Sequence, residues 1–142
     1  MTGSEYRLST ALVQMAHLVE RVFTEVARDY GLTRQQIELL CVLSQGPQGM
    51  TGLSEILGLG RSGLTGLVDR VERQGLVTRT RETCDRRAYQ VSLTDKGERL
   101  GLEAHERVSD RLDALGDALP PGDRERIAPL LAALASGEIA PA

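Results

Sequence analysis

LVTRTRETCDRRAYQVSLTDKG, the stretch from Leu76 to Gly97, contains two segments in which apolar and polar residues alternate. Alternation with a period of two is typical of half-buried β-strands. The polar residues 84–87, CDRR, separate the two segments and suit the tip of a hairpin. Thr94 and the residues that follow it are typical of a helix start. The stretch therefore predicts a two-stranded hairpin, with two arginines and one carboxylate at its tip, that leads directly into a helix.

Two short helices are expected directly before this hairpin. Apolar residues within 53–57 line the first, and the segment 58–60, Gly-Leu-Gly, interrupts it. The second runs from about Arg61 to Gln74 and ends at Gly75 in the usual C′ position. Two short helices joined by a glycine turn form a helix-turn-helix, although any αα-hairpin gives a similar pattern. A helix-turn-helix followed at once by a hairpin is a winged helix-turn-helix, so the predicted fold is mainly α with a small β-hairpin wing.

A long amphipathic helix is expected at the N-terminal side. From Tyr6 to Tyr30 the apolar residues are spaced by four and three positions, which is a coiled-coil-like pattern. Its members are Leu8, Leu12, Met15, Val19, Val22 and Val26. The helix is either a core helix of a monomer or a helix that packs partly against a second chain, and the spacing fits both.

The next segment has clear boundary signals. Thr33 with Gln36 makes a capping box at the start of another helix. Cys41 falls on the apolar face of this helix, which predicts a small core residue. Residues 44–50, SQGPQGM, have the composition of a loop.

The C-terminal third predicts two more helices. After Gly97, apolar residues trace a long helix that reaches Leu119. The segment 120–122, Pro-Pro-Gly, breaks this helix. Pro121 is expected to be the first residue of a last helix, which Pro129 is expected to kink.

Composition and charge narrow the function classes. A chain of 142 residues fits one domain of ordinary size. Its net charge is −3, but residues 51–92 hold seven basic and five acidic residues, whereas residues 93–142 hold six and ten. The predicted winged unit is thus the basic part of the chain, and this is a weak indication of nucleic-acid binding.

Cysteine and histidine usage indicates no metal and no disulfide framework. Cys41, Cys84, His17 and His105 show no ligand spacing. No catalytic motif is present, so we expect neither an enzyme nor a cofactor. No apolar run is long enough to span a bilayer and no leader precedes the first helix. We therefore expect a cytoplasmic protein without a membrane partner.

The layout resembles the MarR family of bacterial winged helix-turn-helix transcription regulators over nearly the whole chain. The most specific motif of the family is an Asp, any residue, an Arg and a strand leading to Leu-Thr. It falls here on Asp85, Arg87, Leu93 and Thr94. LVDRVERQGLV, residues 67–77, also resembles the family's recognition helix, and GLTRQQIELL, residues 31–40, resembles an earlier helix of the family.

The resemblance implies a single MarR-like domain over residues 1–142. Residues 33–97 would form the DNA-binding lobe, and residues 1–30 and 98–142 would supply dimerisation helices. Members of the family typically bind pseudo-palindromic operators in double-stranded DNA as homodimers. Many are released by small organic ligands or by oxidation. We therefore expect a ligand-responsive repressor that acts as a homodimer.

Candidate DNA contacts lie on the predicted recognition helix and on the hairpin. The first turn of a helix in the major groove meets base edges, and a hairpin beside it reaches the minor groove, which favours an inserted arginine. The family motif assigns the minor-groove role to Arg87, and we expect Asp85 to hold its guanidinium in one orientation. The other candidates are Arg61, Ser62, Thr65 and Arg70 on the helix, and Arg79, Arg81 and Arg86, as phosphate contacts, on the hairpin.

Two glycines depart from the family pattern. Gly63 and Gly66 stand where many relatives place a polar or basic side chain that faces DNA. Each costs the helix roughly 0.5–1 kcal/mol relative to alanine. Either the helix backbone approaches DNA closely or base readout is weak here. The glycines and the acidic net charge also leave open a second function, a protein-interaction module on a winged helix that no longer binds DNA.

A regulatory signal would act through a ligand or a thiol. The resemblance places an organic effector between the dimerisation helices and the DNA-binding lobe. The candidate lining residues are Met15, Leu18, Val22 and Leu43. Cys84 stands beside Asp85 and two arginines, so oxidation of this thiol is the alternative signal.

Overall fold

The computed structural model describes residues 7–82 and 85–137, and the side chains in these ranges except those of residues 82–87. Six α-helices, one 3₁₀ helix and three strands follow each other along these residues. In chain order they are α1 (Leu8–Asp29), α2 (Arg34–Leu43), β1 (Gln48–Gly49), α3 (Met50–Leu57), α4 (Arg61–Arg73), β2 (Val77–Glu82), β3 (Asp85–Leu93), α5 (Asp95–Ala114), η1 (Leu115–Ala118) and α6 (Asp123–Ser136). The structure is therefore mainly helical with a small antiparallel sheet, as the sequence predicts.

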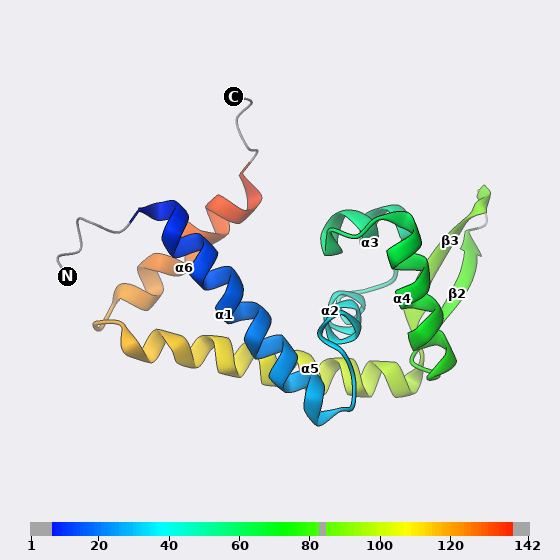
Figure 1. The fold of residues 1–142 in the computed structure, drawn as a ribbon, viewed down its shortest axis with the longest axis horizontal. Coiled ribbons are helices and arrows are strands. Elements are labelled where there is room, and N and C mark those ends of the chain that lie inside the picture. The colour runs from blue at the N-terminus through cyan, green and yellow to red at the C-terminus, as the bar shows by residue number, and fades with distance from the viewer. Residues whose placement is uncertain (1–6, 83–84, 138–142) are drawn as a thin grey trace.

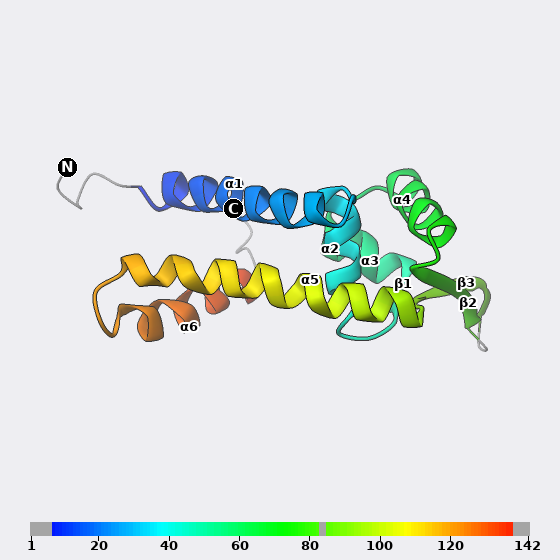
Figure 2. The same ribbon diagram turned by 90° about the horizontal axis from the view of Figure 1, so that it is seen from below.

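The elements are arranged along the long helix α5. Figure 1 shows α1 crossing α5, with α2 beside them and α3, α4 and the β2–β3 hairpin gathered at one end. The helix α6 lies at the opposite end. In Figure 2, α1 lies above α5 and α6 lies below it. The hairpin projects from the end of the molecule in both views. The helix α5 therefore connects the end that carries α3, α4 and the hairpin to the end that carries α6.

Local capping signals act as predicted. The backbone N–H of Gln36 donates to Thr33 Oγ1 over 3.2 Å, and the backbone N–H of Thr33 donates to Gln36 Oε1 over 3.1 Å. This reciprocal pair is the capping box at the start of α2. Thr94 caps α5 in a similar way, since its hydroxyl oxygen accepts from the backbone N–H of Gly97 over 3.1 Å.

The helix-turn-helix is formed by α3 and α4. Gly58 ends α3 with a φ of 65°, a left-handed conformation that glycine adopts without a steric penalty. The Ser54 hydroxyl donates to the carbonyl oxygen of Leu59 over 2.5 Å and closes the turn. The second helix then begins at Arg61, the residue that the sequence indicates.

The sheet contains one strand more than predicted. Its order is β1-β3-β2, and all neighbours are antiparallel. The predicted loop at residues 44–50 is wrong at Gln48 and Gly49, because these residues pair with Val91 and Gln90, and at Met50, which begins α3. A two-residue strand has no recognisable alternation of its own, so only its distant partner reveals it.

The main core joins α1, α2, the helix-turn-helix, the sheet and α5. Its members are Val22, Val26, Ala27, Ile37, Leu39, Leu40, Cys41, Leu43, Leu53, Leu64, Leu67, Val68, Val71, Leu76, Val77, Val91, Ala104 and Val108. The apolar stripe of α1 is divided by this core. Val22 and Val26 are buried, whereas Leu8, Leu12 and Met15 are exposed. The C-terminal part of α1 is thus a core helix, and its N-terminal part has no cover within the described residues.

Polar contacts also hold α1 against α5. The Arg111 guanidinium forms an ion pair with Glu25 at 2.5 Å. Arg107 pairs with Asp29, and its guanidinium carbon lies 5.5 Å from the centre of the Tyr30 ring. Exposed ion pairs contribute about 0–1 kcal/mol each, so packing remains the main stabilising force of this joint.

The C-terminal helices differ from prediction in their boundaries. The helix predicted to reach Leu119 loses its α-helical form after Ala114 and continues as the 3₁₀ turn η1. The last helix begins at Asp123, not at Pro121, because Gly122 adopts a left-handed φ of 89° that no α-helix accommodates. Pro129 lies inside α6.

Candidate nucleic-acid interface

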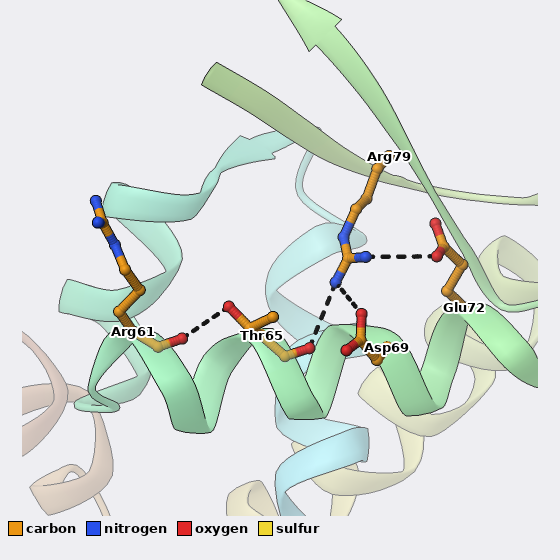
Figure 3. A network of polar contacts seen from close by, with 5 residues as sticks. All are labelled: Arg61, Thr65, Asp69, Glu72 and Arg79. Atoms are coloured by element: carbon orange, nitrogen blue, oxygen red, sulfur yellow. Dashed lines mark hydrogen bonds and ion pairs between the residues drawn. The ribbon is translucent and has the colours of Figure 1, made fainter. Parts of the chain in front are cut away.

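The first turn of α4 presents polar side chains to solvent. Leu64, Leu67, Val68 and Val71 fill the core side of this helix, which fixes its rotation. Arg61, Ser62 and Thr65 are exposed as a consequence. The Thr65 hydroxyl donates to the carbonyl oxygen of Arg61 over 2.8 Å, and the Arg61 side chain extends away from the helix (Figure 3). Among the described residues, no acidic side chain lies within ion-pair distance of the guanidinium of Arg61 or of Arg70.

Arg79, an expected phosphate contact, is occupied within the chain. It lies on β2, and its Nη2 atom is 2.6 Å from Oδ1 of Asp69 on α4. Its Nη1 atom is 3.5 Å from Oε1 of Glu72, and Nη2 also donates to the carbonyl oxygen of Thr65 over 3.4 Å. Figure 3 shows the guanidinium directed at the side of α4. The structure therefore brings the guanidinium of Arg79 to α4.

Arg81 lies two residues further along the same strand, so both arginines occupy one face of β2. Its strand partner is Tyr89 on β3. The guanidinium carbon of Arg81 lies 5.5 Å from the centre of the Tyr89 ring, and Nη2 donates to the Tyr89 hydroxyl over 3.2 Å. Both residues are exposed. A cation–π contact of this kind limits the orientations of the arginine while leaving charge accessible to solvent.

The tip of the hairpin is described only by its backbone. Asp85 begins β3 and pairs with Glu82 across an irregularity in the register. The expected contacts of Arg86 and Arg87, and the expected orienting role of Asp85, depend on side chains that lie outside the described ones. Cys84 lies outside the described residues altogether.

Packing within the chain does not require glycine at the two glycine positions of α4, Gly63 and Gly66. A Cβ atom added to Gly63 would meet nothing within 4 Å, and one added to Gly66 would lie at 3.6 Å, an ordinary contact, from Nη1 of Arg70. Neither glycine has a positive φ. The described residues therefore tolerate a side chain at both positions.

The four candidate residues of an effector pocket differ in burial. Val22 and Leu43 belong to the main core. Met15 is exposed and Leu18 is partly buried, and neither packs against that core. The main core thus covers the C-terminal part of α1, which carries Val22, and leaves Met15 exposed.

Cys41 is a buried residue of α2, as its position on the apolar face predicts. Burial, with a smaller contribution from the carboxylate of Glu38, raises the pKa of the Cys41 thiol to about 11. Among the described residues, no group of three or more histidine, cysteine and acidic side chains could hold a metal ion.

Sequence patterns did not indicate three residues that shape this surface. Asp69 and Glu72 hold Arg79, and Tyr89 holds Arg81. The acidic pair is three residues apart on α4, which places both on one flank, but no local signal shows that β2 passes along that flank. Tyr89 lies in the second of the two predicted strands, and its pairing with Arg81 follows from the strand register alone.

Comparison with known proteins identifies the family. A family model described as "MarR family" matches residues 30–88. The HTH-type transcriptional regulator FarR of Neisseria gonorrhoeae is 30% identical over 132 residues, which cover 92% of this chain and 90% of FarR. The homoprotocatechuate degradative operon repressor of Escherichia coli is 30% identical over 104 residues, which cover 72% of this chain and 70% of the repressor.

Solved structures agree with these relatives. NadR in complex with 4-hydroxyphenylacetate is 28% identical with a TM-score of 0.78, and the match covers 97% of this chain and 99% of NadR. Wild-type MarR from E. coli in its apo form gives a TM-score of 0.77 at 22% identity, with 93% and 98% covered, which is a likeness of fold. No helix among the described residues is long and apolar enough to cross a membrane. The chain belongs to the MarR family of winged helix-turn-helix transcription regulators.

Proposed function

We propose that this regulator is a homodimeric, ligand-responsive repressor that binds a pseudo-palindromic operator through α4 and the β2–β3 hairpin. The observation that carries the proposal is the exposed first turn of α4, where Arg61, Ser62 and Thr65 face solvent. A helix of this kind enters the major groove with its N-terminal residues at the base edges. Arg81, held by Tyr89, stands beside it on the hairpin as a phosphate contact. We keep Arg70 and Arg86 as further backbone contacts and Arg87 as the minor-groove contact.

The homodimer is supported by apolar surface at the end remote from the hairpin. Leu8, Leu12 and Met15 on α1 are exposed, and so is every described residue of α6 from Arg124 onward. A 14-residue helix without packing is marginal in water. A second chain that covers α6 and the N-terminal part of α1 would stabilise both. Two copies of α4 would then meet half-sites about 34 Å apart, or about 10 bp.

The effector and the sign of regulation are proposed from relatives. The E. coli relative is named a repressor, and NadR was solved with 4-hydroxyphenylacetate. We propose that this chain also represses, and that it responds to a small organic molecule bound between the dimerisation helices and the DNA-binding lobe. Met15 and Leu18 remain the proposed lining residues, because their side chains are not committed to the main core.

A titration of the DNA upstream of the protein's own gene tests the proposal. We expect a shifted band in a gel at nanomolar protein concentration, retained against excess unrelated DNA, and protection of a two-fold symmetric site. Arg61→Ala should weaken this binding by about 1–3 kcal/mol, as for a lost base contact. Equal binding to unrelated DNA, or none to either, would contradict the proposal and favour a protein-interaction module.

A further inference from the structure

We infer that Arg79 is a positioning residue, which locks the β2–β3 hairpin against the recognition helix α4 and does not contact phosphate. The inference rests on the proposed DNA-binding function and deepens it. It concerns how the two DNA-reading elements keep one relative position. Thr65, Asp69 and Glu72 provide the helix side of the lock.

The geometry uses the guanidinium as a bridge. Its two terminal nitrogens contact three oxygen atoms from three places on one flank of α4 (Figure 3). Nη2 is 2.6 Å from Oδ1 of Asp69 and 3.4 Å from the Thr65 carbonyl oxygen, while Nη1 is 3.5 Å from Oε1 of Glu72. The planar fork of arginine suits such divided contacts, whereas the single ammonium of lysine does not. The bridge therefore depends on shape as well as on charge.

Burial and charge keep Arg79 on the helix. Its side chain is 23% exposed, against 38% for Asp69 and 41% for Glu72, so the cation is the most enclosed of the three. If Arg79 turned to a phosphate, two carboxylates would remain uncompensated on the helix that approaches DNA. The negative charges of these two carboxylates would repel the phosphates of DNA. Both effects oppose release of Arg79 when DNA binds.

The position of the bridge in the hairpin makes the tip sensitive to its loss. Arg79 pairs with Val91 in the middle of the hairpin, and the last pair before the tip is Glu82 with Asp85. Three residues of strand span about 10 Å. A rotation of about 10° at the bridge would therefore displace the tip by about 2 Å, which exceeds the tolerance of a groove contact, about 0.5 Å. Loss of the bridge is expected to affect tip contacts that Arg79 itself never makes.

The salt dependence of operator binding separates a bridge from a phosphate contact. A phosphate contact contributes about 0.9 to the slope of log K against log salt, or about 1.8 for both subunits of a dimer. Arg79→Gln should lower operator affinity about tenfold and leave this slope unchanged. Arg79→Lys keeps the charge but should lose most of the same affinity. Arg81→Gln, a charge-matched change two residues away, should flatten the slope.

Two further variants complete the set. Arg34→Gln removes an arginine that pairs with Glu38 at 2.7 Å within α2, outside the proposed interface, and should change neither affinity nor slope. Asp69→Asn should weaken binding despite removing a negative charge. Combined with Arg79→Gln it should cost little more than either change alone, because both break one contact.

Opposite outcomes have distinct meanings. If Arg79→Gln flattens the slope by about 1.8 and Arg79→Lys restores affinity, Arg79 is a phosphate contact and the inference is wrong. If wild-type protein shows no operator-specific binding, the proposed function fails but the bridge is still tested by amide hydrogen exchange. Arg79→Gln and Arg79→Lys, with circular dichroism to confirm folding, should speed exchange in β2 and β3 at least tenfold relative to Arg34→Gln. Unchanged exchange would overturn the bridge.

Discussion

At the scale of single residues, neighbours decide what each arginine of the hairpin does. Arg79 and Arg81 are two positions apart on one strand and look equivalent in sequence. The first meets two carboxylates of α4 and is enclosed, while the second lies over an exposed tyrosine. One charge is thus neutralised within the chain and the other remains available to a partner. Side-chain type alone does not distinguish them.

Cys41 gives a prediction at this scale. With a pKa of about 11, only about one thiol in a thousand is ionised at pH 8. In a Cys84→Ser variant, Ellman's reagent at pH 8 should label folded protein at least about a hundredfold more slowly than protein in denaturant. Equal rates would contradict the burial of the thiol.

The same raised pKa predicts that the free energy of unfolding decreases at high pH. The folded state holds the Cys41 proton more tightly than the unfolded state, so its contribution is complete below the unfolded pKa, about 8.5. It decreases as pH rises from that value towards about 11. Unfolding of Cys84→Ser in urea should show this loss between pH 8.5 and about 11, and a Cys41→Ala variant of it should not.

The tip residues give a further prediction at this scale. If Asp85 orients Arg87, Arg87→Ala should weaken operator binding by about 1–3 kcal/mol. Asp85→Ala should weaken it too, with little further effect in the Arg87→Ala background. Simple repulsion between a carboxylate and phosphate predicts the reverse, so tighter binding by Asp85→Ala in a filter-binding titration would rule out the orienting role.

At the scale of elements, the start of α5 packs against the turn between α4 and β2. The backbone N–H of Thr94 donates to the carbonyl oxygen of Leu76 over 3.0 Å, and its hydroxyl donates to that of Gly75 over 2.6 Å. A Cβ atom on Gly97 would lie 1.9 Å from the Leu76 carbonyl oxygen. Glycine is therefore required where α5 begins, and α5 is fixed to the turn that joins α4 to β2.

Glycines in α4 and α5 should respond oppositely to alanine. Gly97→Ala should lower the free energy of unfolding by 1 kcal/mol or more, at roughly the cost of overpacking. Gly63→Ala should raise it by about 0.5–1 kcal/mol, because its Cβ meets nothing and alanine favours the helix. Urea denaturation measures both, and a destabilised Gly63→Ala would contradict the open surface.

The same Gly63→Ala protein decides between two accounts of α4. Weaker operator binding by a more stable protein would mean that DNA approaches the helix backbone closely. Unchanged binding would mean that this part of the helix contributes little to base readout. A gel titration of Gly63→Ala beside wild type distinguishes them.

At the scale of the whole molecule, the two ends of the molecule differ in how much of their apolar surface is buried. At the end that carries α3, α4 and the hairpin, residues of the same chain form a buried core. The other end leaves Leu130 65% exposed and Leu8 60% exposed. Large exposed apolar surface is typical of contacts between protein chains. The molecule is therefore expected to be completed by its own copy.

Leu130→Arg tests this expectation. If α6 packs against a second copy, the change should convert a dimer to a monomer at micromolar concentration in sedimentation equilibrium, because an unpaired charge would be buried. Ile56→Arg is the matched control, since Ile56 is 56% exposed but lies on α3, outside the proposed dimer surface. A Leu130→Arg protein that remains dimeric would place the interface elsewhere.

The sequence by itself determined the elements whose signals are local. The capping box at Thr33, the glycine turn at Gly58 and the alternation of β2 and β3 all formed where predicted. The family motif also indicated a DNA-binding surface on α4 and the hairpin. These signals depend on hydrogen bonds and periodicities within a few residues, so a linear pattern contains them.

Only the tertiary structure decided the rest. It paired Gln48 with Val91, gave Arg79 to Asp69 and Glu72, and buried one part of the α1 stripe while exposing the other. Each of these outcomes depends on which segments meet after the chain has folded. Contacts between different segments of the chain are set by packing of the whole core, and no local pattern of residues specifies them.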